Sequence, residues 1–290
     1  MLGKLIKHEW KSTYKMCGII IMVIAGMTLV GALGFVLPFK LIMEDSEALE
    51  ESMMGAFWAM MMMMSMVLYI IALVGASYAM MIYQGVHFYK TMYTDEGYLT
   101  QTLPVTPRQL LFSKTLVAGI WNLLVGLSIG ISIMILIFAF ISSVAPPEAW
   151  RELDEVWREL QREMARDMDA QLSFSIAHAV LSLLLMFIVT PFCTMMTMFG
   201  ALTIGQLSKK YKALIGILSY FGMMIVQSIL MQILQFVFTF GNVLFQNSIR
   251  TENYTNVFGT YDSSIVVALI MGVSMYFVAH HILTRKLNMD

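Results

Sequence analysis

Long apolar runs alternate with short polar segments along almost the whole chain. Six of these runs reach the roughly 20 residues that an α-helix needs to cross a bilayer. They cover residues 17–39, 57–82, 110–142, 172–204, 213–240 and 263–284. The pattern therefore predicts an all-α polytopic membrane protein with six transmembrane helices, built as a single transmembrane domain over residues 1–290.

Charge in the polar segments predicts the orientation of these spans. Twelve of the 18 Lys and Arg residues, but only 4 of the 19 Asp and Glu residues, fall on the side that holds both chain ends. Basic residues collect on the cytoplasmic side of membrane proteins. We therefore expect both termini in the cytoplasm. The net charge of −1 gives no reason to expect a nucleic-acid partner.

An amphipathic helix is expected at each of two places outside the spans. In residues 1–16, four lysines alternate with apolar residues at helical spacing, and Trp10 is a candidate anchor in the headgroup region. A basic flank that only fixes topology is the alternative interpretation. In residues 147–169, on the extracellular side, Trp150 and Trp157 belong to a heptad-like apolar seam. This seam predicts an extracellular cap over the protein.

The polar segment 84–109 is too long for a simple connection between two helices. We expect a short cytoplasmic coupling helix, a turn over residues 103–107, and a helix that begins near Arg108. Thr106 is a suitable N-cap and Pro107 suits the first helical position.

Polar residues inside the fifth span have two interpretations. Gln227, Ser228 and Gln235 either hydrogen-bond to neighbouring helices or line a transport pathway. The chain has no phosphate-binding loop of the GxxxxGK[ST] type, no HExxH and no GxSxG motif. No Asp or Glu falls within the expected spans, and we expect neither enzymatic activity nor a resident metal or cofactor.

The segment DEGYLTQTLPVTPRQLLFSK, residues 95–114, resembles the permease subunits of bacterial type-2 ABC exporters. The resemblance implies a multi-pass subunit of the bacterial plasma membrane that pairs with a second permease copy or a related permease. It also implies two copies of a separate ATPase subunit, which bind ATP and Mg²⁺. The residues implied to couple this chain to the ATPase are Asp95, Glu96, Gly97, Leu103, Pro104 and Arg108.

The exported substrate is not readable from the sequence, and lipid-like molecules, drugs and peptides all remain open. Two other functions are consistent with the pattern of spans. One is an ATP-independent secondary carrier or channel, and the other is a membrane scaffold or sensor that transports nothing. The extracellular helix is larger than the resemblance leads one to expect.

The extracellular seam gives a first test. Burial of each Trp in it should stabilise the helix by about 1.5–3 kcal/mol, so residues 147–169 should exchange amide hydrogens slowly in the purified protein. Changing both Trp150 and Trp157 to Ser should accelerate that exchange. Rapid, unprotected exchange in the unmodified protein would rule out a packed cap.

Overall fold

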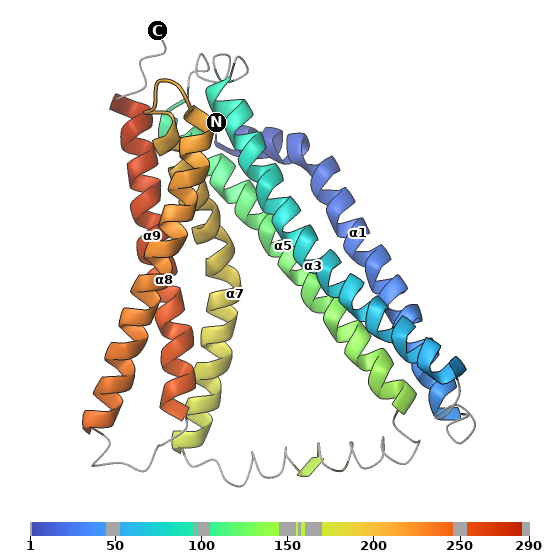
Figure 1. Ribbon diagram of the computed structural model, residues 1–290. Coiled ribbons are helices and arrows are strands. Elements are labelled where there is room, and N and C mark those ends of the chain that lie inside the picture. The colour runs from blue at the N-terminus through green and yellow to red at the C-terminus, as the bar shows by residue number, and fades with distance from the viewer. Residues whose placement is uncertain are drawn as a thin grey trace. The chain divides into compact units, whose positions relative to one another are not determined.

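The computed structural model describes residues 2–44, 53–94, 97, 105–144, 155, 158–159, 170–245 and 254–285. Within these ranges the chain forms helices joined by short turns, with no β-strand (Figure 1). The long helices are α1 (Leu2–Glu44), α3 (Met53–Tyr93), α5 (Pro107–Val144), α7 (Ala170–Gly205), α8 (Lys212–Phe245) and α9 (Tyr254–Arg285). All six are long and apolar enough to cross a membrane, which confirms the expected six-helix, multi-pass architecture.

Large apolar side chains are exposed along every one of these helices. Met22, Met63 and Phe236, for example, expose 74%, 71% and 68% of their surface. Water would oppose such exposure, whereas lipid tails are as apolar as these side chains and accept it. The outward-facing surface therefore fits a hydrocarbon environment.

The helices form two compact units. The first contains residues 1–13, 81–123 and 170–290, and the second contains residues 14–80 and 124–169. Helices α1, α3 and α5 each contribute residues to both units, whereas α7, α8 and α9 belong to the first alone.

Hydroxyl groups join the three helix segments of the second unit. The Ser132 hydroxyl on α5 lies 2.6 Å from the Thr28 hydroxyl on α1 and 2.6 Å from the Tyr69 hydroxyl on α3. On α3, the Ser65 hydroxyl donates to the backbone oxygen of Gly34 at 2.9 Å. Such interhelical hydrogen bonds hold membrane helices together where hydrophobic burial gives little driving force.

The first unit has an aromatic and sulfur-rich core. The rings of Phe88 on α3 and Phe199 on α7 stack with their centroids 4.0 Å apart. The core also includes Leu111 on α5, Met195 on α7 and Ala279 on α9, and all three side chains are almost completely buried. The flexible thioethers of methionine fill the irregular gaps between such helices.

Two of the elements expected from sequence have a different extent, and the start of a third is confirmed. Residues 2–16 are helical and continue directly into the first span as α1, and residues 84–93 are the last turns of α3. Helix α5 begins at Pro107, and the backbone N–H of Gln109 lies 3.4 Å from the Thr106 hydroxyl, which confirms the expected cap.

Of residues 147–169, which are expected to be extracellular, only Glu155, Arg158 and Glu159 are among the described residues, and each is helical. Trp150 and Trp157 lie outside the described residues. The placement of residues 2–16 in the headgroup region and the separate coupling helix stay predictions.

Glycine permits the close contact between α7 and α9. A Cβ atom on Gly272 would lie only 2.9 Å from the Cα atom of Cys193. The neighbouring atom is backbone, so one helix would have to move away from the other. A Cβ atom on Gly222 of α8 would meet no atom within 4 Å.

These two glycines give a matched test of helix packing. Gly272→Ala should lower the free energy of unfolding by about 1–3 kcal/mol, the usual cost of overpacking. Gly222→Ala makes the same change in helix propensity without the clash and should not destabilise the protein. Thermal unfolding of the purified variants in detergent measures both. Equal stability of the two variants would contradict the close α7–α9 contact.

Candidate functional site

The first turns of α1 place one acidic side chain against α3 and α5. Glu9 and Thr13 lie one helical turn apart, so they share a face, and both are buried. The lysines at positions 4, 7, 11 and 15 are all exposed, on the opposite side of the helix. Glu9 is thus the acidic member of a basic segment, and it faces the protein interior.

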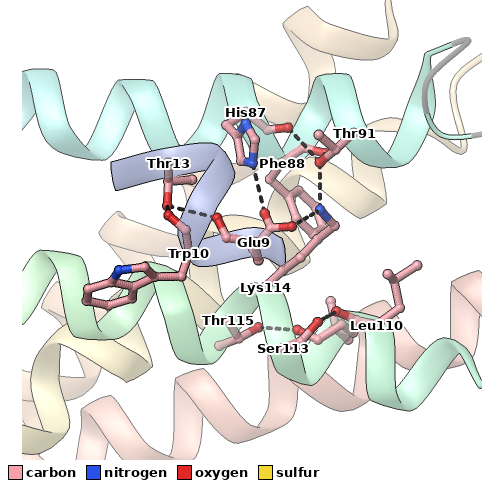
Figure 2. Close-up of polar contacts among 11 residues, drawn as sticks. Glu9, Trp10, Thr13, His87, Phe88, Thr91, Leu110, Ser113, Lys114 and Thr115 are labelled. Atoms are coloured by element: carbon pink, nitrogen blue, oxygen red, sulfur yellow. Dashed lines mark hydrogen bonds and ion pairs between the residues drawn. The ribbon is translucent and has the colours of Figure 1, made fainter. Parts of the chain in front are cut away.

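Both carboxylate oxygens of Glu9 have partners on other helices (Figure 2). One oxygen, Oε1, lies 2.8 Å from Nε2 of His87 on α3. The other, Oε2, accepts a hydrogen bond from Nζ of Lys114 on α5 at 2.9 Å. Lys114 Nζ also donates to the Thr91 hydroxyl at 2.8 Å. We call Glu9, His87, Thr91 and Lys114 the charged cluster.

The sequence places two members of the charged cluster on one face of α3. His87 and Thr91 are four residues apart and therefore lie one above the other. The Thr91 hydroxyl donates to the backbone oxygen of His87 at 2.8 Å, which leaves its lone pairs for the ammonium group of Lys114. The hydroxyl is thereby oriented as an acceptor towards α5.

The cluster is largely shielded from solvent. The side chains of Lys114, Glu9 and His87 expose only 3%, 12% and 14% of their surface. Moving a charge out of water costs several kcal/mol, and an opposite charge with full hydrogen bonding offsets this cost. Loss of the Glu9 carboxylate would therefore leave the Lys114 ammonium group buried without a counter-charge.

Next to the charged cluster, two indole rings join α1 to α5. Trp10 stacks on Trp121 with a centroid separation of 4.4 Å and an interplanar angle of 22°. Trp10 is 37% exposed and Trp121 only 7%. The indole nitrogen of Trp121 is buried and has no hydrogen-bond partner among the described residues. Trp10 is therefore held by the protein itself, and its role as a headgroup anchor stays a prediction.

The residues implied in coupling are only partly described. Gly97 is buried, and its backbone N–H donates to the backbone oxygen of Thr94 at 2.7 Å. Arg108 is exposed near the start of α5, and its backbone oxygen lies 3.5 Å from the Tyr276 hydroxyl. Asp95, Glu96, Leu103 and Pro104 lie outside the described residues.

The polar residues of the fifth span do not all come together. Gln227 and Ser228 on α8 line a pocket among α7, α8 and α9. Gln235 is half-buried further along α8 and is not among the residues that line this pocket. The role of these residues in a pathway stays a prediction.

Sequence reasoning missed the charged cluster. It counted Glu9 only as a charge, and it used Lys114 as a charge and as the last residue of the segment that resembles exporter permeases. Glu9 is the sole acid among the first 16 residues, which is the one local sign of a special role.

The described part of the chain has no group of three or more His, Cys, Asp and Glu side chains that would hold a metal ion. Comparisons with protein-family models, with curated proteins and with solved structures gave no match.

The charged cluster predicts a strong coupling between two substitutions. Glu9→Gln alone should lower the free energy of unfolding by roughly 3–5 kcal/mol, because it leaves the buried ammonium group of Lys114 without a counter-charge. Lys114→Met alone should lower it by less, because Nε2 of His87 still lies 2.8 Å from the Glu9 carboxylate. The double variant should recover much of the loss caused by Glu9→Gln. Thermal unfolding in detergent measures the cycle.

Lys11→Met is the matched control, because Lys11 is exposed on the same turn of α1. It should change the stability little. Additive losses in the Glu9→Gln/Lys114→Met double variant would contradict a direct interaction between the two side chains.

Proposed function

We propose that this chain is the membrane-spanning permease subunit of an ATP-driven ABC exporter, in which a separate subunit hydrolyses ATP. The observation that carries the proposal is the position of the charged cluster. Glu9 bonds to His87 near the end of α3 and to Lys114 near the start of α5. These are the two helices on either side of the segment that resembles the coupling region of such permeases.

A segment that receives force needs a stiff connection to the helices that move. The end of α3 is fixed by the Phe88–Phe199 stack and by a hydrogen bond of 2.7 Å between the hydroxyls of Tyr93 and Thr203 on α7. Together with the charged cluster, these contacts link the end of α3 to α1, α5 and α7. A displacement of residues 94–106 would move these helix ends together rather than bend one of them.

The chemistry of the chain agrees with a subunit that performs no reaction. The sequence lacks a phosphate-binding loop, so ATP and Mg²⁺ would be bound by the partner. Two such ATPase subunits would dock on the cytoplasmic segments of two permeases in the bacterial plasma membrane. The exposed Arg108 is one of the groups available for that contact.

One observation favours a second candidate function, an ATP-independent secondary carrier. Glu9, His87 and Lys114 are ionisable and largely buried, and all three fall within helices that are candidate membrane spans. Buried ionisable groups of this kind occur along proton and ion pathways. The cluster lies within the first few turns of α1, however, and its charges compensate one another, which favours a structural link.

The proposal predicts a partner and a specific uncoupled variant. The native protein should co-purify with an ATPase, and transport by the complex should require ATP. Gly97→Leu should uncouple ATP hydrolysis from transport, because a Cβ atom there would lie 2.5 Å from the carbonyl carbon and oxygen of Met92. Glu96→Lys should also uncouple them, by reversing a charge in the contact.

Gly75→Leu is the control, because a Cβ atom at this position on α3 meets no atom within 4 Å. It should leave coupling intact. Unchanged ATPase activity and transport in the Gly97 and Glu96 variants would refute the coupling role. Flux driven by an ion gradient in liposomes that contain this chain alone would support the carrier instead.

A further inference from the structure

A half-open pocket of about 400 Å³ lies among α7, α8 and α9. Its walls include Thr194 and Thr197 from α7 and Met224, Gln227 and Ser228 from α8. The candidate spans of these two helices are Val180–Gly205 and Lys212–Val237, so these residues fall near the middle of each span. The pocket therefore lies at the depth of the hydrocarbon core, and its volume suits a small organic ligand.

The polar groups of this pocket carry no formal charge. The hydroxyls of Thr194 and Thr197 donate to backbone oxygens of their own helix, each at 2.9 Å, and keep lone pairs free to accept. Gln227 is half-buried and Ser228 is exposed, and the side chain of neither makes a hydrogen bond to a described residue. The pocket thus offers amide and hydroxyl donors, together with several acceptors, beside apolar methionine walls.

An amide without a partner is costly in hydrocarbon, where no water is available to bind it. A pocket occupant that brings its own hydrogen-bonding group removes this cost. A charged ligand would find no counter-charge among the lining residues, and burial of its charge at this depth would be unfavourable. A purely apolar ligand would leave Gln227 and Ser228 unsatisfied.

We propose that this pocket binds a neutral amphipathic small molecule with an amide or hydroxyl head. The head would bond to Gln227 and Ser228, and the apolar body would pack against the methionine side chains. That this molecule is the exported substrate rests on the proposed function, whereas its binding does not. Substrate sites of membrane transporters commonly lie near the bilayer midplane.

Photo-crosslinking of the full-length protein in lipid nanodiscs tests the proposal. The probe is an N-alkyl amide that carries a benzophenone group, and the labelled residues are mapped by mass spectrometry. The expected result is saturable labelling of α7 and α8 around the pocket, displaced by excess unlabelled amide. The corresponding carboxylate and trimethylammonium probes should not label the pocket saturably.

The variant Gln227→Leu/Ser228→Ala should weaken amide binding about tenfold, as expected for the loss of two ordinary hydrogen bonds. Gln232→Leu is the matched control. Gln232 is exposed on the same helix, about 140° around its axis from Gln227, and does not line the pocket. It should not change the binding.

Each other outcome overturns the proposal. Labelling that does not saturate would identify bulk lipid as the occupant. Equal weakening by both variants would show that the pocket side chains do not recognise the head. If the Gln227→Leu/Ser228→Ala variant changed the oligomeric state of the protein but not its labelling, a second copy of the chain would be the occupant of the pocket. Because no ATPase is present in this assay, its result is independent of whether an ATPase partner exists.

Discussion

A buried charge is stable only when a group of opposite charge lies beside it, and this constraint determines how the first unit is assembled. Lys114 is almost completely enclosed, so α5 is stable in its position only while the Glu9 carboxylate faces it. Glu9 in turn requires the first turns of α1 to lie beside both α3 and α5. One acidic side chain therefore sets the position of the N-terminal segment more firmly than its apolar residues do, because lipid would accept those residues equally well.

The second unit follows the same principle with neutral groups. Its helix segments are linked by the hydroxyls of Thr28, Tyr69 and Ser132 and by the Ser65 hydroxyl against the backbone of Gly34. Apolar contact distinguishes poorly between one helix arrangement and another in a membrane, whereas a hydrogen bond has a direction and a length. The few polar side chains in these spans consequently carry much of the structural specificity.

The sequence was sufficient for features that depend on local pattern. The six spans followed from apolar run length, and the start of α5 followed from Thr106 and Pro107, because a helix cap involves residues only three positions apart. The charged cluster was not predictable in this way. The two contacts of the Glu9 carboxylate join residues 78 and 105 positions apart, and no periodicity connects them. Likewise, Gln227 and Gln235 are both polar residues of the same span, but of these two only Gln227 lines the pocket among α7, α8 and α9.

The row of hydroxyls in the second unit has a fixed direction. The Thr28 hydroxyl donates its single proton to the backbone oxygen of Ile24 at 2.7 Å, so it can only accept from Ser132. Ser132 has then used its own proton and must accept from Tyr69. The row therefore runs from α3 through α5 to α1 and ends at an amide carbonyl, a group that cannot pass a proton onward. Although this row of hydroxyls resembles a proton wire, it cannot conduct protons across the unit. Its role is structural, because its directed hydrogen bonds link three helices.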